Sequence, residues 1–337
     1  MHRTASNTSQ NVIEKVRPLC QLVRHAPDSD LLTSFNRLKT LPCLFGIGSA
    51  PPADEGSVKI LFAHDGSAAS HAAIDEMRRA GFPAKGDAFV VCTAGDRLGN
   101  QNHSARKHDA ADAGKNELAA AKRLAELAGN RIQANFPKWN LSSDAFSGVP
   151  ADVILKTSGW WQSDMVIIGS DTFAVDRLRM SSVSLEVVHR AQCSVRIVRF
   201  GVADTSGQIQ LVIGNSGLRD CESVIHEVAR RHWPEDTRVH IVSVVDTTVP
   251  QEERNLAIAI DDDWVRQLKH AGLTVDQTLI EGNPSQELLR QSLRWKADTI
   301  FMGPRRIRRV GRFLLGSVAT AVVTRSRSTV EVVRGVE

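Results

Sequence analysis

The chain has 337 residues, 42% of them hydrophobic and 24% charged, and a formal net charge of +4. This composition is typical of globular proteins, and the length fits two domains of about 150 residues each. No apolar run approaches the ~20 residues of a membrane helix, and the N-terminus lacks the apolar core of a secretory signal. We therefore expect a cytoplasmic protein without a membrane partner. The weak charge does not indicate a nucleic-acid partner, because such proteins concentrate basic charge on one face.

The N-terminal extension, residues 1–57, does not match the rest of the chain. Apolar residues recur at helical spacing over 11–23, interrupted by Pro18, and the composition of 46–57 is that of a linker. Two interpretations stay open. The extension is either a poorly ordered tail with transient helices or a docking segment that folds onto a partner or onto the body.

A first repeat begins at residues 58–64, a strand that is apolar on both faces, as central parallel strands are. It ends in Asp65-Gly66-Ser67, and Ser67 is the expected N-cap of a helix over 68–80. Further strands are predicted at 87–93, 141–147, 164–168 and 194–198, and helices at 110–136 and 151–161 and from Ser181 onward. Strands that alternate with helices predict a parallel sheet with helices on both faces.

A second repeat follows in the same order. Its predicted strands are 209–213, 238–245, 274–280, 298–302 and 329–333, and its predicted helices are 218–232, 250–271, 285–295 and 319–325. We expect two similar domains, 58–200 and 209–337, joined by a linker at 201–208. Because a duplicated, self-associating ancestor would leave a self-complementary face, we expect them to pack as a pseudo-dimer. A single continuous sheet through both halves would count against this duplication.

Cysteine and tryptophan positions indicate packing. The five cysteines form no C-x-x-C pair, so neither a zinc ribbon nor a disulfide framework is expected. Cys92 and Cys193 lie in apolar strand-like runs and are predicted to be core residues. Trp160-Trp161 and Trp295 end equivalent helices, and we expect them to pack in the core or between the domains.

Each half resembles the universal stress protein family. The resemblance rests on residues 60–67, 148–150, 164–170 and 182–183 in the first half, and on 281–284, 298–303 and 316–318 in the second. It implies two tandem α/β domains, each with a five-stranded parallel sheet covered by helices on both faces. It also implies a non-enzymatic regulatory or protective role in the stress response, dimer formation, and, in many members, ATP binding.

The ATP pattern of that family is Gly, two residues, Gly, nine residues, then Gly-Ser or Gly-Thr, with an Asp after the first strand. In the second half Gly303, Gly316 and Ser317 match, and Val318 follows. Arg306 takes the place of the middle glycine, and Asn215 takes the place of the Asp. Arg306 would either clamp phosphates through its guanidinium or fill the space that they need. Asn215 would hydrogen-bond a ribose hydroxyl.

In the first half Asp65, Gly169 and Ser182 are kept, whereas Thr172 and Ser181 replace the other two glycines. A Cβ at Ser181 would block close backbone approach to a phosphate and forbid positive φ. We therefore predict a degenerate site in the first half and a partly retained site in the second, where a helix N-terminus with Ser317 can hold an anion.

Three functional hypotheses remain. The first is a stress-response protein that binds ATP with Mg²⁺ in the second half, together with unidentified protein partners. The second is a scaffold of the same fold that has lost its ligand, and the third is a slow ATPase, for which no residue is an evident base. The basic residues after Gly303 are interpreted as a solvated loop, as phosphate contacts or as a nucleic-acid contact: Arg305, Arg306, Arg308, Arg309 and Arg312. The sequence does not decide whether the chain also forms homo-oligomers.

Overall fold

The computed structural model describes residues 57–95, 107–170, 181–200, 207–215, 220–245, 262–303, 305–306 and 313–335. For residues 107–113, 220, 262, 305–306 and 313–314 it describes the backbone alone. The chain divides into two compact units, 1–52 and 53–337, and everything below concerns the second. Apart from Ser57, the N-terminal extension lies outside the described residues, and so do the helices expected in it.

In the first half, strands and helices alternate as predicted. The strands are β1 (Lys59–Ala63), β2 (Asp87–Ala94), β3 (Asn140–Ser147), β4 (Met165–Ser170) and β5 (Ser194–Arg199), and the helices are α3 (Ala68–Glu76), α4 (Lys107–Asn135), α5 (Pro150–Trp161) and α6 (Ser182–Arg190). A 3₁₀ turn, Met77–Arg79, extends α3. Gly66, at φ +81°, turns the chain out of β1. Ser67 then caps α3, because its Oγ accepts from the Ser70 N–H at 3.2 Å.

The second half repeats this order. Its strands are β6 (Gln210–Asn215), β7 (Arg238–Val245), β8 (Thr274–Glu281), β9 (Thr299–Met302) and β12 (Thr329–Val332), and its helices are α7 (Asp220–Ala229), α9 (Asp262–His270), α10 (Pro284–Arg294) and α11 (Ser317–Arg325). Of the helix predicted over 250–271, the residues before 262 lie outside the described part. A short hairpin that the sequence did not predict, β10 (Arg305–Arg306) with β11 (Phe313–Leu314), lies between β9 and α11.

Each half contributes five strands that are parallel to one another, in the orders β3-β2-β1-β4-β5 and β8-β7-β6-β9-β12. The two first strands start in the same way. The Asp164 carboxylate accepts from the Lys59 N–H at 2.8 Å, and the Asp298 carboxylate accepts from the Gln210 N–H at 2.8 Å. Lys59 and Gln210 are therefore equivalent positions, and this fixes the register between the halves.

The ten strands form one continuous sheet, because β5 and β12 pair antiparallel at the junction of the halves. The expectation that a continuous sheet would contradict the duplication was wrong. The fifth strand of each half is the edge of its own sheet, and two such edges can join through their free backbone groups. From the junction outward, equivalent strands follow in the same order in both halves, so each half keeps a complete sheet of its own.

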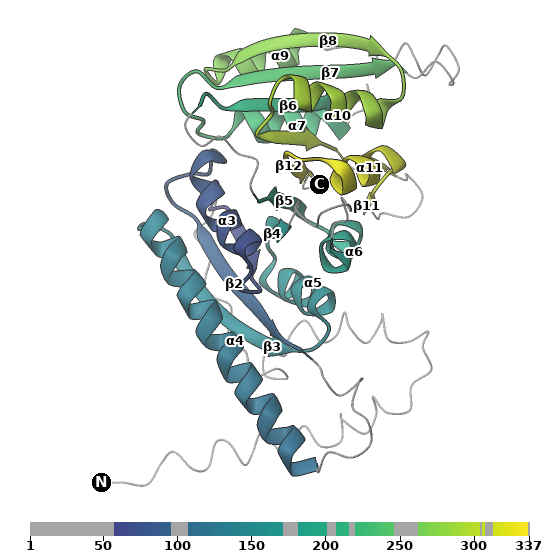
Figure 1. The fold of residues 1–337 in the computed structure, drawn as a ribbon. Coiled ribbons are helices and arrows are strands. Elements are labelled where there is room, and N and C mark those ends of the chain that lie inside the picture. The colour runs from purple at the N-terminus through teal and green to yellow at the C-terminus, as the bar shows by residue number, and fades with distance from the viewer. Residues whose placement is uncertain are drawn as a thin grey trace, which may run out of the picture. The chain divides into compact units, whose positions relative to one another are not determined.

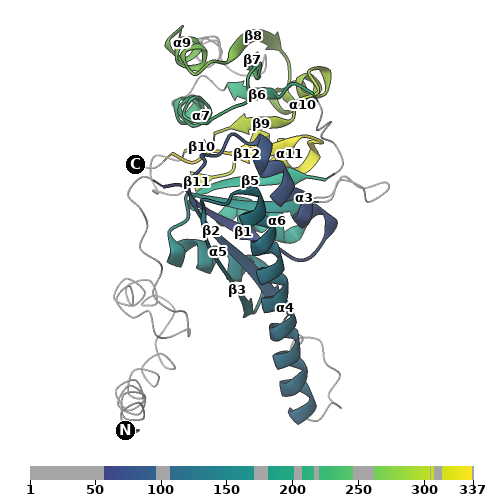
Figure 2. The same cartoon turned by 90° about the vertical axis from the view of Figure 1, so that its left-hand side faces the viewer.

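Helices lie on both faces of the sheet (Figures 1 and 2). On the face of α5, α6, α10 and α11, one core runs through both halves, from Leu61 and Trp161 to Ile300 and Val332. On the other face the cores are separate, one with α3 and α4 in the first half and one with α7 and α9 in the second. The helices α6 and α11, which follow the loops of the expected nucleotide pattern, thus belong to the shared core.

Candidate nucleotide site

In parallel α/β sheets, ligands bind at the carboxyl ends of the strands. At this end of the first half, the Asp65 carboxylate is engaged in its own turn, because its Oδ1 accepts from the Ser67 N–H at 3.0 Å. Burial acts to raise the pKa of Asp65, but the hydrogen bonds from Ser67 and Ser70 outweigh it and hold the pKa below its ordinary value. The carboxylate is therefore charged at neutral pH.

Gly169, the first glycine of the degenerate pattern, lies within β4. A Cβ built at this position would stand 2.2 Å from the Ala69 carbonyl oxygen and 2.5 Å from the Ser70 nitrogen. The glycine therefore lets the first turn of α3 pack directly against β4. This packing alone accounts for the glycine, so its match to the nucleotide pattern carries no information about a phosphate.

The N-terminus of α6 is capped by the chain itself. The Oγ of Ser181 accepts from the Ser184 N–H at 3.1 Å and lies 2.9 Å from the Ser184 hydroxyl. Ser182 follows as the first helical residue. The side chain of Ser181 thus takes a position at which a phosphate would meet the helix N-terminus.

The equivalent helix of the second half, α11, begins differently. Gly316 is its N-cap residue, and no side chain in the described part of the chain caps it. Ser317 is the exposed first residue of the helix, and Val318 is half-buried behind it. Gly316 has φ −65° and Ser181 has φ −60°, so the two backbones match. The expected reason for degeneracy at Ser181, a forbidden positive φ, is therefore wrong; the difference is the Ser181 hydroxyl.

The hairpin β10–β11 brings arginines back to this helix start. Arg306 pairs with Phe313 and Arg305 pairs with Leu314, two residues before Gly316. The backbone that leaves Gly303 therefore turns back beside the segment that enters α11. Of the predicted second-half residues, the chain thus brings Gly303, Arg306, Gly316, Ser317 and Val318 to one loop.

Asn215 does not take the place of Asp65. Because Lys59 and Gln210 are equivalent, Asn215 corresponds to His64, and the residue that corresponds to Asp65 is Ser216, outside the described residues. Asn215 is 6% exposed, and its side-chain Nδ2 donates to Ser243 Oγ at 2.9 Å. Its amide thus joins β6 to β7 within the sheet.

Comparison with known families decides what these halves are. The family model described as "Universal stress protein family" matches residues 58–199 and again residues 210–334. The chain belongs to the universal stress protein family.

Solved structures of universal stress proteins share the fold over most of this chain. One from Archaeoglobus fulgidus is 17% identical with a TM-score of 0.60, and the match covers 83% of this chain and 100% of that one. A putative universal stress protein from Pseudomonas aeruginosa is 17% identical with a TM-score of 0.52, covering 83% and 94%. A functionally unknown protein from the same species is 16% identical with a TM-score of 0.52, covering 83% and 93%. No match was found among curated proteins.

In this universal stress protein, His64 is a buried polar residue that the sequence reading overlooked. Its Nδ1 accepts from the Gly66 N–H at 3.2 Å, and its ring meets the ring of His71 edge-on at 4.8 Å. Burial, followed by the nearby His71, lowers its pKa to about 4. The sequence does contain a signal for His64, because it stands directly between an apolar strand and the turn Asp-Gly-Ser.

Trp161 packs in the core and Trp160 packs against it, as predicted, whereas Trp295 is only half-buried. Trp161 is buried in the shared core beside Phe89, and Trp295 stacks on His240 at 3.7 Å. Cys92 is buried in a strand, as predicted, whereas Cys193 is only half-buried. Within the described ranges, no three His, Cys, Asp or Glu residues gather as a metal site would need, and no helix has the length and apolarity to cross a bilayer.

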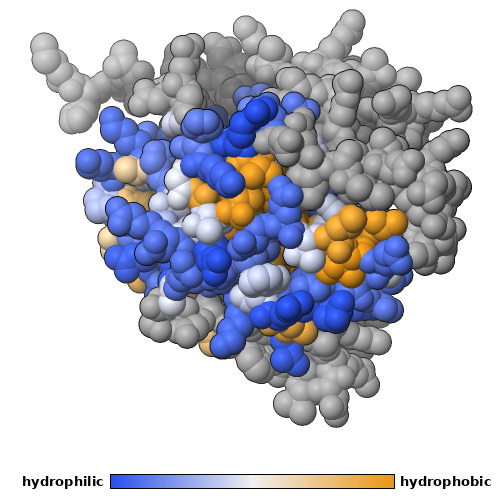
Figure 3. Space-filling model, turned by 90° about the horizontal axis from the view of Figure 1, so that it is seen from above, coloured by the Kyte–Doolittle hydropathy of each residue, from blue (hydrophilic) through white to orange (hydrophobic). Residues whose placement is uncertain are grey.

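Viewed from the β8 end, the surface is mostly hydrophilic, with separate hydrophobic patches rather than one apolar face (Figure 3). The exposed large hydrophobic residues of β8 and α10 are Leu279 and Leu293.

Proposed function

We propose that this universal stress protein is a non-enzymatic component of the stress response that holds one adenine nucleotide, ATP with Mg²⁺, in its second half. Membership in the family supports the stress-response role. The observation that carries the nucleotide proposal is the contrast between two helix starts: Ser181 caps α6, whereas no described side chain caps α11 at Gly316.

The phosphates would lie at the start of α11. Gly316 leaves room for close approach, and the first N–H groups of the helix with the Ser317 hydroxyl would donate to phosphate oxygens. Gly303 would open the loop after β9, and Arg306 would supply the positive charge that a triphosphate needs. Asn215 has no part in this proposal, because its amide is bound to Ser243.

A reciprocal exchange of the two N-cap residues tests the proposal. Gly316→Ser gives α11 the cap that α6 has, and Ser181→Gly removes it from α6. We expect calorimetric titration with ATP and Mg²⁺ to find one site per chain in the wild type, unchanged affinity at that site in Ser181→Gly, and at least ~10-fold weaker binding in Gly316→Ser, which is ~1.4 kcal/mol. Gly316→Val should abolish binding.

Gly316→Ser is also its own folding control. Serine is at least as good an N-cap as glycine, so this variant should unfold no earlier than the wild type in urea. Two equal sites in the wild type would contradict the assignment of the first half. Full affinity in Gly316→Ser would contradict the assignment of the phosphates to α11.

The second candidate function is a ligand-free scaffold. It is favoured by Gly169 and Asn215, since packing against α3 and a hydrogen bond to Ser243 account for both residues without a ligand. Mass spectrometry of small molecules released from the freshly purified protein separates the candidates. About one equivalent of nucleotide supports the site, whereas no nucleotide together with no calorimetric binding supports the scaffold. A phosphate-release assay tests the slow ATPase.

A further inference from the structure

A pair of opposite charges lies at the centre of the junction between the halves. Arg196 of β5 faces Glu331 of β12 in the antiparallel ladder, and its Nη1 donates to Glu331 Oε2 at 2.7 Å. Both side chains are fully buried. The two residues also hold equivalent positions, because Ser194 and Thr329 begin their strands in the same register. The duplicated position thus carries a base in one half and an acid in the other.

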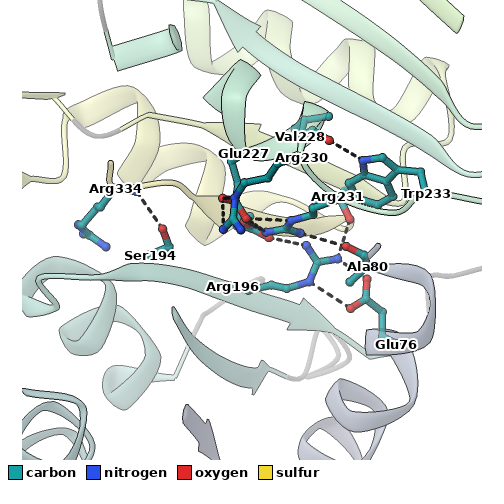
Figure 4. Close-up of polar contacts among 12 residues, drawn as sticks. Glu76, Ala80, Ser194, Arg196, Glu227, Val228, Arg230, Arg231, Trp233 and Arg334 are labelled. Carbon is teal, nitrogen blue, oxygen red and sulfur yellow. Dashed lines mark hydrogen bonds and ion pairs between the residues drawn. The ribbon is translucent and has the colours of Figure 1, made fainter. Parts of the chain in front are cut away.

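The pair belongs to a row of alternating charges that crosses the junction (Figure 4). Glu76 of α3 accepts from Arg196 at 2.5 Å, and Glu331 accepts from Arg231, which also donates to Glu227 of α7 at 2.7 Å. Glu76 and Glu227 are themselves equivalent, since they follow Lys59 and Gln210 by the same number of residues. Each half therefore brings its own flanking acid; the centre of the row differs in sign, and Arg231 of the second half corresponds to the uncharged Ala80.

The apolar neighbours of the pair do not distinguish the halves. Val195 and Ile197 of β5 face Val332 and Val330 of β12, so each side offers two β-branched residues. Two first halves or two second halves could pair their valines and isoleucines equally well. Because these apolar contacts give no preference, the charged residues at the centre of the junction, Arg196 and Glu331, can distinguish the halves, and Arg231 adds a contact to the Ala80 carbonyl at 3.1 Å.

Pairing of like halves would place equal charges face to face. In a pair of first halves, each Arg196 would keep Glu76 of its own half but would meet a second guanidinium instead of the Glu331 carboxylate. In a pair of second halves, each Glu331 would keep Arg231 of its own half but would meet a second Glu331 carboxylate instead of the Arg196 guanidinium. Like charges that face each other in such a buried position repel strongly, and repulsion against wrong partners is a common source of specificity.

We propose that the β5–β12 junction is a selective interface at which a first half accepts a second half, of its own chain or of a second copy, and rejects its own kind. Arg196 and Glu331 are the residues that determine this choice. The proposal does not depend on nucleotide binding. It explains how copies of a duplicated chain avoid pairing two first halves or two second halves through the same strands.

Charge reversal in separate full-length chains tests the proposal. Arg196→Glu gives a chain with acids in both halves, and Glu331→Arg gives a chain with bases in both. Alone, each chain lacks a complementary partner for closure, and we expect its melting temperature to fall by about 6–10 °C. Co-expressed, they can exchange halves and form a two-chain complex in which one junction is wholly native: Arg196 and Glu76 from one chain, Glu331, Arg231 and Glu227 from the other.

The readout is the capture of one chain through an affinity tag on the other, followed by light scattering. We expect the reversed chains to be captured at about 1:1 with twice the mass of one chain, at least ~10-fold above the capture between two wild-type chains. A matched control is the pair Ile197→Ala with Val330→Ala, which weakens the same junction without charge and should stay at the wild-type level.

Capture of the reversed chains at or below the wild-type level overturns the proposal, even if each chain alone fails to fold, because their mixture contains a native junction. Equal capture in the alanine pair also overturns the proposal, because weakening of the junction without any change of charge would then be sufficient for two chains to exchange halves. If each reversed chain closes alone and has the melting temperature of the wild type, the two charges do not select the partner.

Discussion

Arg199, the last residue of β5, and Arg334, which follows β12, occupy equivalent positions, and each reaches across the junction to the same point of the opposite half. The Arg199 guanidinium donates to the Val323 carbonyl in the last turn of α11, and the Arg334 guanidinium donates to the Val188 carbonyl in the last turn of α6. Val188 and Val323 lie equally far from the N-caps of their helices. Burial lowers the pKa of each arginine to about 10, so both stay charged at neutral pH.

These arginines take the place of C-terminal caps. The last carbonyl groups of a helix lack partners within the helix and form the negative end of its dipole. We expect Arg199→Met and Arg334→Met each to lower the free energy of unfolding by about 1.5–3 kcal/mol, because each removes charge-assisted hydrogen bonds. Since Arg199 and Arg334 hydrogen-bond to different residues, the double variant should lose the sum of the two effects. Urea denaturation checks this, and a variant with no loss would contradict the capping role.

Gly169 and Gly159 form a matched pair for the packing of α3 on β4. A Cβ at Gly169 would overlap the Ala69 carbonyl, whereas no atom lies within 4 Å of a Cβ at Gly159 in α5. We expect Gly169→Ala to cost more than about 3 kcal/mol, as overpacking against backbone does, and Gly159→Ala to add about 0.5–1 kcal/mol. Urea unfolding measures both. Equal effects of the two substitutions on the free energy of unfolding would show that α3 can move away from β4 without a loss of stability.

His240 replaces an aromatic residue of the first half. It corresponds to Phe89, which packs on Trp161 at 5.8 Å, whereas His240 stacks on Trp295 at 3.7 Å. Burial lowers the pKa of His240 and outweighs Asp276, which raises it; Arg238 also lowers it. The unfolded state therefore takes up the proton first, and the stability contribution is lost as the pH falls below about 6.5. His240→Phe should flatten this part of the stability profile, and an unchanged profile would contradict the role of His240.

The sequence predicted what regular patterns encode. Apolar runs and turn residues predicted the repeated strands and helices, and motifs such as residues 60–67 and 164–170 in the first half and 298–303 and 316–318 in the second indicated the family. It failed where the outcome depends on tertiary contacts. The sequence placed Asn215 at the position of Asp65, because no residue pattern marks where β1 and β6 end. Only the backbone register shows that Asn215 corresponds to His64. The joining of β5 to β12 and the burial of Arg196 follow from charges far apart in sequence, which no local period reveals.

His64 should be the strongest acid-sensitive group of the first half. It faces His71 of α3, Arg131 of α4 and Asp65; burial and then His71 lower its pKa to about 4, although Asp65 acts in the opposite direction. Because the folded pKa lies below the ordinary 6.5, the unfolded state binds more protons between these values. The contribution of His64 is complete above pH 6.5 and is lost toward pH 4, at up to about 1.4 kcal/mol per pH unit.

The second half supplies the replacement that tests this. Asn215 corresponds to His64, and Ser243, its hydrogen-bond partner, corresponds to Cys92. We expect His64→Asn to flatten the urea stability profile between pH 6.5 and 4, and the double variant with Cys92→Ser to be more stable than His64→Asn alone by about 1 kcal/mol, because it restores an amide–hydroxyl hydrogen bond. As a control, His71→Asn removes the imidazole ring beside His64 and leaves His64 itself in place. A profile that keeps its slope after His64→Asn would assign the acid sensitivity to other groups.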